Sequence, residues 1–264
     1  MIQAVVIQGK KVDRDRAKRI AESFSCELTE NIPQDKEAMY FIMDKTGLSF
    51  MAKGQLLKGD FTRLLPRVSA GHLQHEILLK VARGASKGGD DGSLRADAGE
   101  NVSAEKMLRA LDATAGLGED SFILAAGGMN VEMFEHNPVT AALLGDALIR
   151  GRQDPATKDI CRRMTMRQGD SKILMQNLNY TPDIIYLDPM FPEKKKSAES
   201  KKKLQVLHKI EEPCSDETEL LQAAMALKAG KIIIKRPPGC EYLAQVKPTY
   251  SLERKAVRFD CIVM

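Results

Sequence analysis

The segment Asp188-Pro189-Met190-Phe191-Pro192 combines residue types suited to binding a flat ring that carries an amino group. It follows Ile184-Ile185-Tyr186-Leu187, an apolar, β-prone run typical of a buried strand. The Asp188 carboxylate can accept an amine hydrogen, a nearby backbone carbonyl can accept another, and the Phe191 ring can stack on a base. A strand that ends in a proline turn, with Phe191 in the core, explains the same five residues equally well.

A glycine turn follows an earlier predicted strand. Asp112-Ala113-Thr114-Ala115-Gly116-Leu117-Gly118 places two glycines one residue apart, which permits a tight turn and close backbone approach to a ligand. Glu119 and Asp120 open the next helix and would repel a pyrophosphate, so the turn favours a ligand with a cationic part. Ser121 replaces the third glycine of a dinucleotide fingerprint, and a plain strand-to-helix turn is the alternative.

Two further predicted strands end in acidic residues. Glu135 ends one of them, where an acid can accept both hydroxyls of a ribose. His136 beside it either faces the same pocket or is an ordinary loop residue. Asp170 follows the next strand and can accept from an adenine amino group, but a helix N-cap by Asp170 or Ser171 explains that position as well.

Positive charge gathers after two of these strands, although the formal net charge is only +4. A lysine run is usually a solvated face, but next to a candidate base pocket it favours contact with phosphates. The candidate phosphate-binding residues are Lys194, Lys195, Lys196, Lys201, Lys202, Lys203, Lys235 and Arg236.

The elements that must position these residues alternate along the second part of the chain. Predicted strands separated by helical segments indicate βαβ units and a mostly parallel sheet. We expect strands at 108–112, 130–135, 164–168, 183–187 and 231–235, helices at 120–126, 138–150 and 217–228, and a closing antiparallel pair at 250–254 and 257–263.

The first part of the chain predicts a smaller α/β unit. Its expected elements are a strand at 1–7, a helix at 13–24, a hairpin of 39–43 with 48–52, and a helix at 72–82. The polar, Gly-rich stretch 84–101 predicts a loop or linker. We therefore expect a small domain at 1–70, a helix and linker at 71–103, and a larger domain at 104–264.

Composition excludes several classes of protein. Five cysteines, odd in number and without a CxxC pair, fit reduced thiols in the cytoplasm and argue against a disulfide framework or a zinc site. No apolar run approaches the roughly 20 residues of a membrane span. His72 and His75 lack a third ligand, so we expect a structural or RNA-facing helix and no metal.

Small or acidic residues at four successive strand ends are the pattern of a Rossmann-like S-adenosylmethionine (SAM) methyltransferase. More closely, the chain resembles the ribosomal RNA small subunit methyltransferase J family from about residue 108 to its last residue. The resemblance is carried, in the family's order, by Asp112–Gly118, Glu135–Pro138 with Ala141–Leu144, Tyr186–Pro192 with Lys196–Ala198, and Lys235–Pro237.

This resemblance implies methyl transfer from SAM to the exocyclic N2 amine of one guanosine near the 3′ end of 16S rRNA. It implies a cytoplasmic enzyme whose partner is 16S rRNA or the small ribosomal subunit. Pro189 and Phe191 would join Asp188 in the catalytic motif. The cofactor contacts that we expect are Asp112, Gly116, Gly118, Glu119, Asp120, Glu135, His136, Asp170, Ser171 and Asp188.

The chain also departs from the family pattern. Glu119 and His136 stand where arginine is common, and Asp170 stands where serine is common. Two other functions stay open on the sequence. The first is another amino-methyltransferase, acting on DNA adenine or a protein amide, and the second is a non-catalytic RNA-binding assembly factor. A dehydrogenase is disfavoured by the missing third glycine and by Asp120.

Overall fold

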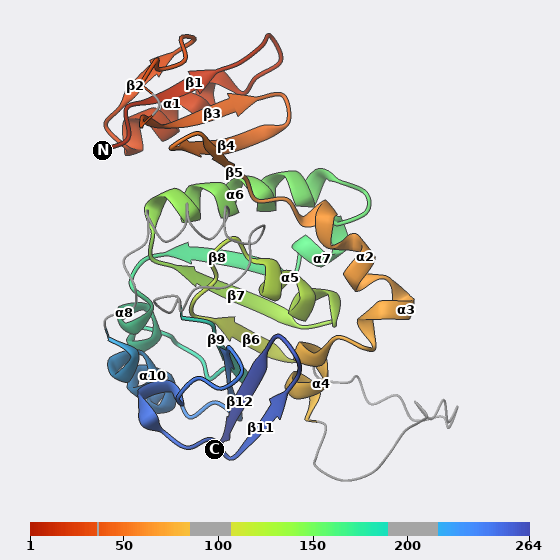
Figure 1. The fold of residues 1–264 in the computed structure, drawn as a ribbon. Helices are drawn as coiled ribbons and strands as arrows, with labels where there is room; N and C mark the ends of the chain where they lie inside the picture. Colours follow the sequence, from red (N-terminus) through yellow and green to blue (C-terminus); the bar gives the residue numbers. More distant parts are fainter. Residues whose placement is uncertain (36, 85–106, 190–215) are drawn as a thin grey trace.

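A computed structural model describes residues 1–35, 37–84, 107–189 and 216–264 (Figure 1). Phe191, the six lysines between 194 and 203, and all but the first residue of the predicted 84–101 loop lie outside this description. Within the described ranges, no helix has both the length and the apolar character needed to cross a bilayer.

The larger sheet has seven strands in the order β11-β12-β10-β9-β6-β7-β8. The five strands from β8 to β10 are parallel, whereas β12 runs antiparallel to both of its neighbours. This confirms the predicted mostly parallel sheet with an antiparallel C-terminal strand. The strands are β6 (Arg109–Asp112), β7 (Asn130–Glu135), β8 (Met164–Gln168), β9 (Ile184–Leu187), β10 (Lys231–Arg236), β11 (Tyr250–Glu253) and β12 (Arg258–Val263).

Helices cover both faces of this sheet, which is why its central strands are nearly continuous apolar runs. Helices α4, α5 and α6 pack on one face together with α7, and α8 and α10 pack on the other. The helices are α4 (Ile77–Arg83), α5 (Glu119–Ala126), α6 (Pro138–Gln153), α7 (Lys158–Cys161), α8 (Ser171–Gln176) and α10 (Glu217–Ala226), with a 3-10 turn η2 (Leu243–Gln245).

The strand order reverses between β6 and β9, which are neighbours in the sheet but far apart in the chain. In open α/β sheets, ligands bind beyond the carboxyl ends of the strands at such a switch point. The residues that follow β6 include the glycine turn, and the residue that follows β9 is Asp188. The topology therefore brings two of the predicted motifs to one edge of the sheet.

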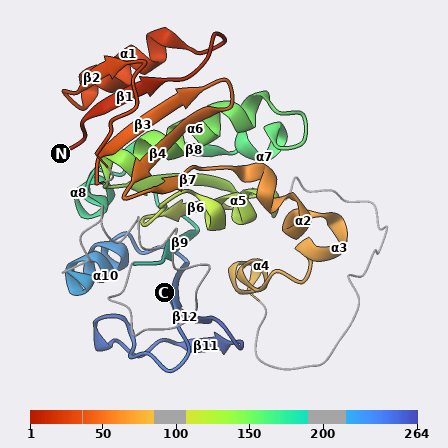
Figure 2. The same cartoon turned by 45° about the horizontal axis from the view of Figure 1, so that its top comes forward.

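The first residues form a separate five-stranded sheet in the order β2-β1-β3-β4-β5, with α1 packed on it. Figure 2 shows this sheet lying over α6. Apolar side chains of the two parts share one cluster, in which Phe41 and Phe50 meet Val139 and Leu143 of α6. The elements are β1 (Ala4–Ile7), α1 (Arg14–Ser23), β2 (Glu27–Thr29), β3 (Met39–Asp44), β4 (Gly47–Ala52) and β5 (Gln55–Leu57).

The segment between the two sheets differs from the single helix predicted at 72–82. It contains a 3-10 turn η1 (Phe61–Leu64) and short helices α2 (Leu65–Val68) and α3 (Ala70–Leu73), and α4 begins only at Ile77. Glu76 is extended, with ψ of 119°, and its carboxylate receives two hydrogen bonds from Arg67 at 2.8 and 2.9 Å. The break lets Leu78 and Leu79 turn into the core. The predicted domain limits at 70 and 104 stay a prediction.

Candidate active site at the carboxyl edge of the sheet

Asp112 organises the glycine turn from inside the protein. Its carboxylate is 1% exposed and accepts hydrogen bonds from the Thr114 amide at 3.0 Å and from the Ser121 hydroxyl at 2.5 Å. Burial raises the pKa of Asp112 to about 7, and the negative charges of Asp120 and Asp188 add to that effect. These contacts indicate that Asp112 shapes the turn, whereas a direct cofactor contact stays a prediction.

The two glycines of the turn differ in what surrounds them. Both have positive φ, +54° at Gly116 and +75° at Gly118. A Cβ at Gly118 would lie 2.7 Å from Cδ1 of Leu144, so this glycine is required by packing. A Cβ at Gly116 would meet no atom within 4 Å, so open space lies beside it. Gly116 therefore borders a space that a ligand could fill, which we call the cradle. Gly118 packs the turn closely against Leu144 of α6.

Glu135 holds the glycine turn against the end of β7. Its Oε2 accepts from the Gly116 amide at 2.7 Å, and its Oε1 accepts from the Asn137 amide at 2.7 Å. The side chain is 6% exposed and thus has a fixed place next to the cradle. A carboxylate at the end of this strand is the kind of group that accepts the hydroxyls of a ribose. His136, the next residue, is exposed.

Asp170 and Ser171 begin α8. Asp170 is the N-cap of this helix, because its Oδ1 accepts from the Lys172 amide at 2.9 Å. Ser171 makes a different contact, since its hydroxyl donates to the Ala113 carbonyl at 2.5 Å. The N-cap interpretation is confirmed for Asp170, and Ser171 ties α8 to the glycine turn. A contact of either residue with adenine stays a prediction.

Asp188 lies in a network of charged side chains at the switch point. The ammonium of Lys235 lies 2.6 Å from Oδ2 of Asp120 and 2.8 Å from Oδ2 of Asp188. The Tyr186 hydroxyl donates to the same Asp120 oxygen at 2.6 Å. The amide of Asp188 donates to Oγ1 of Thr114 at 2.6 Å. Asp188 is thereby fixed relative both to the neighbouring strand and to the glycine turn.

The charges in this network shift one another's pKa values. Burial disfavours the charged form of Asp120, but Lys235 and Tyr186 outweigh it, and the pKa of Asp120 is lowered. For Asp188 burial dominates and Lys235 offsets only part of it, so the pKa of Asp188 is raised. Burial alone would lower the pKa of Lys235, yet the two carboxylates raise it. Lys235 therefore stays cationic between two carboxylates.

The predicted phosphate contacts divide into two groups. The six lysines from 194 to 203 lie outside the described residues. Lys235 instead points to Asp120 and Asp188, and the guanidinium of Arg236 is 6% exposed, donating to the Glu241 carbonyl and to Glu217. These contacts favour an internal role for both residues, and neither is placed like a free surface cation.

Sequence reasoning missed the roles of Tyr186 and Lys235 within this network. A signal for Lys235 is present, because it follows Ile232, Ile233 and Ile234 directly at the carboxyl end of a buried strand. A cation in such a position needs a carboxylate partner. Tyr186 is predicted only as an apolar residue of β9, and nothing in the neighbouring sequence indicates where its hydroxyl points.

In the described part of the chain, no group of three or more His, Cys, Asp or Glu is placed to hold a metal.

The chain is similar to known methyltransferases. Residues 80–264 match the model of a family described as "Putative SAM-dependent methyltransferase". The chain is 35% identical over 253 residues to ribosomal RNA small subunit methyltransferase J of Chromobacterium violaceum, an alignment that covers 95% of this chain and 92% of that protein. It is 44% identical to the Tolumonas auensis protein of the same name, over 58% of this chain and 62% of that one.

A solved structure extends the likeness to the whole fold. The crystal structure of a SAM-dependent methyltransferase from Neisseria gonorrhoeae superposes with a TM-score of 0.70 at 25% sequence identity. That superposition covers 99% of this chain and 96% of the other. The match therefore includes the small N-terminal sheet as well as the seven-stranded one.

Proposed function

Since this chain belongs to the ribosomal RNA small subunit methyltransferase J family of SAM-dependent methyltransferases, we propose that it methylates the exocyclic N2 amine of a guanosine in 16S rRNA. The observation that supports this most is the place of Asp188. Its carboxylate follows β9 at the switch point, and its amide is bonded to Thr114 of the glycine turn. An amine acceptor thus lies beside the cofactor cradle.

The residues of the cradle fit SAM. Gly116 faces open space, Glu135 offers a fixed carboxylate for ribose hydroxyls, and the acidic residue Asp120 opens α5. A cationic sulfonium is favoured near carboxylates, unlike a pyrophosphate. When bound, SAM supplies an electrophilic methyl group. Asp170 and His136 complete the predicted cofactor contacts, and Glu119 opens the same helix.

Asp188 would orient the amine that accepts the methyl group. Its Oδ2 is held by Lys235, and no described residue donates a hydrogen bond to Oδ1, which is left for an amine hydrogen of the base. The side chain is 37% exposed, so a base can reach it. A backbone carbonyl near Pro189 would take the second hydrogen, and Phe191 would stack on the ring. After methyl transfer the amine releases its proton to solvent water, so no strong base is needed.

Positioning can supply much of the rate in such a site. Holding two reactants in line is worth up to about 7–11 kcal/mol of the barrier. The three hydrogen bonds that fix Asp188 and its partner Lys235 serve this purpose.

Because the substrate would be 16S rRNA, free or within the small subunit, we propose that the reaction takes place in the cytoplasm.

Transfer of a labelled methyl group tests the proposal. The purified protein would be incubated with labelled SAM and, separately, with small ribosomal subunits lacking the mark, naked 16S rRNA, DNA and a protein mixture. We expect label in the ribosomal RNA alone, at a guanine N2. Label in DNA adenine or in protein would show another amino-methyltransferase. No transfer together with no SAM binding would show a non-catalytic assembly factor.

A further inference from the structure

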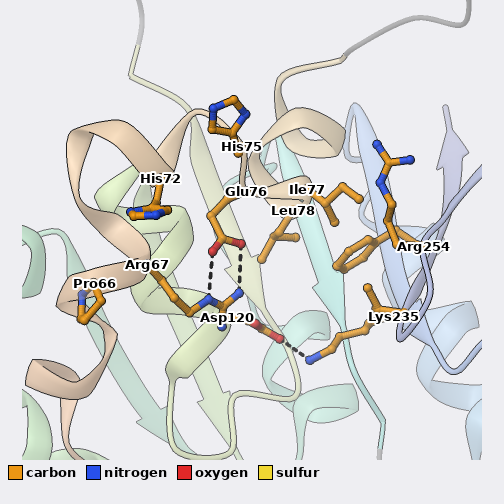
Figure 3. A pocket seen from close by; sticks show the side chains of 12 residues that line it. Pro66, Arg67, His72, His75, Glu76, Ile77, Leu78, Asp120, Lys235 and Arg254 are labelled. Atoms are coloured by element: carbon orange, nitrogen blue, oxygen red, sulfur yellow. Dashed lines mark hydrogen bonds and ion pairs between the residues drawn. The ribbon is translucent and has the colours of Figure 1, made fainter.

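A pocket of about 720 Å³ opens beside the charged network of Asp120, Asp188 and Lys235. Its walls are the segment 66–78 on one side and the residues between β11 and β12 on the other (Figure 3). Asp120 and Lys235 lie among its lining residues, and Lys235 touches Asp188 at 2.8 Å. Only the side chain of Lys235 therefore separates the pocket from Asp188, the carboxylate that would orient the target amine. Its volume is within the range of about 300–1,000 Å³ typical of small-molecule sites.

Most of the charged side chains that line this pocket are already paired. Arg67 and Glu76 form a bidentate pair at 2.8 and 2.9 Å, and Lys235 pairs with both Asp120 and Asp188. The hydrogen bond to Glu76 is the main reason why the pKa of Arg67 is raised, and Asp120 and Glu119 add to it. These pairs reduce the negative charge that a phosphate in the pocket would meet.

The rim carries positive and hydrogen-bonding groups. Arg254 is exposed and has no side-chain partner among the described residues. His72 and His75 are exposed on the opposite wall, and Nδ1 of His72 is 2.9 Å from the Ser69 hydroxyl (Figure 3). A guanidinium and two imidazoles on two sides of an opening suit a phosphate oxygen.

Between rim and floor the lining is apolar. Ile77 and Val257 are partly buried, and Phe259 is 4% exposed. Apolar and aromatic side chains accept the flat face of a base, while cations at the edge take its phosphate. A polar amino acid or a free anion would use only part of such a surface.

We infer that this pocket binds a nucleotide of the substrate RNA strand, with Arg254 and His72 at its phosphate and Ile77 and Val257 against its base, beside the buried Phe259. This inference rests on the proposed function and adds the surface that holds the RNA. It gives the His72 and His75 segment a role in RNA binding and none in metal binding.

Single substitutions on the rim test the inference. Arg254→Ala and His72→Ala remove the groups assigned to the phosphate. Lys255→Ala is the matched control, because Lys255 is the next residue, is exposed and does not line the pocket. Binding of a 16S rRNA fragment containing the target guanosine would be measured at several salt concentrations, together with binding of S-adenosylhomocysteine by calorimetry.

We expect Arg254→Ala to weaken RNA binding about tenfold and to lower the slope of log K against log salt by about one, with S-adenosylhomocysteine binding unchanged. His72→Ala should weaken RNA binding by a smaller factor, and Lys255→Ala should match the wild type. Equal effects of Arg254→Ala and Lys255→Ala would overturn the inference, as would a loss of S-adenosylhomocysteine binding in the rim variants. If the wild-type protein transfers no methyl to rRNA, the proposed function fails instead.

Discussion

Lys235 is the residue on which the two carboxylates of the site depend. It lies 2.6 Å from Asp120 and 2.8 Å from Asp188, and its positive charge acts to lower the pKa of both, although burial leaves the pKa of Asp188 raised. Burial acts in the opposite direction on each carboxylate. Lys235 is therefore a positioning residue that keeps Asp188 ionised and in place, even though it reaches no reacting atom itself.

Lys235→Gln should shift the pH dependence of methyl transfer. Without the cation the pKa of Asp188 rises further, so the ionised form is reached only at higher pH and the acidic limb of the profile moves upward. We expect kcat at neutral pH to fall by up to about 10²-fold, because Asp188 also loses its orientation. Single-turnover rates between pH 5 and 9 measure both effects.

Lys235→Arg is the control variant, because it keeps the positive charge but changes the geometry of the group that carries it. It should restore the wild-type position of the acidic limb while recovering only part of the rate. A profile of Lys235→Gln that is lower but unshifted would show that Lys235 supports the fold alone.

Asp112 provides a second pH effect, on stability. Its pKa is raised by burial from 3.8 to about 7, so the folded protein holds this proton more tightly than the unfolded chain does. Such a group contributes stability below about pH 4 that is lost as the pH rises to about 7, on the order of 4 kcal/mol. Asp112→Asn cannot ionise, so its free energy of unfolding should rise relative to the wild type between pH 4.5 and 7.5. Urea denaturation at both pH values tests this, and parallel profiles would contradict it.

At the scale of elements, the turn between β6 and α5 offers a matched pair of glycines. Gly116→Ala adds a methyl group to open space, so only the positive φ costs stability, roughly 1 kcal/mol. The methyl would occupy the cradle, and we expect SAM binding to weaken at least tenfold. Gly118→Ala adds a methyl 2.7 Å from Leu144 and should lower the melting temperature more strongly. Calorimetry and thermal melts of both variants separate the two roles. Equal loss of SAM binding and stability in both would refute the assignment.

Sequence patterns predicted the longer elements well and the short ones poorly. The predicted limits of β7 and β8 coincide with the observed ones, because an apolar run and its flanking turn residues mark a buried strand. Helix α7 has four residues, too few to show a helical period, and was not predicted, whereas for the six-residue helix α8 only an N-cap at Asp170 or Ser171 was offered, as an alternative. The positions of Glu135 and Asp188 at strand ends could be predicted from the same strand pattern. The pairing of Lys235 with Asp120 could not, because this tertiary contact joins β10 to the start of α5, 115 residues earlier in the chain.

At the scale of the whole molecule, the N-terminal sheet is tied to α6 by a buried charge. Asp146 of α6 is fully buried and meets Arg16 of α1 at 2.8 Å and Arg150 at 2.6 Å. Arg150 also donates to the Gly59 carbonyl at 2.5 Å. Asp146 and Arg150 together therefore connect α1, α6 and the chain that leaves the first sheet.

Asp146→Ala should loosen this connection. Removing one partner of a buried ion pair costs about 3–5 kcal/mol, because two arginines lose their counter-ion. We expect faster hydrogen exchange in α1 and β4 and little change in β9 and β10. Glu22→Ala is the matched control, since Glu22 of α1 pairs with Lys18 only at the surface. Uniformly faster exchange across both sheets would contradict this division of the molecule.

Mapping the modified nucleotide in cells tests the central claim most directly. The gene would be deleted and then supplied as the wild type or as Asp188→Ala, and 16S rRNA from each strain would be digested and analysed by mass spectrometry. The account predicts that one N2-methylguanosine disappears on deletion, returns with the wild type and stays absent with Asp188→Ala. Persistence of every methylguanosine in the deletion strain, or full restoration by Asp188→Ala, would contradict it.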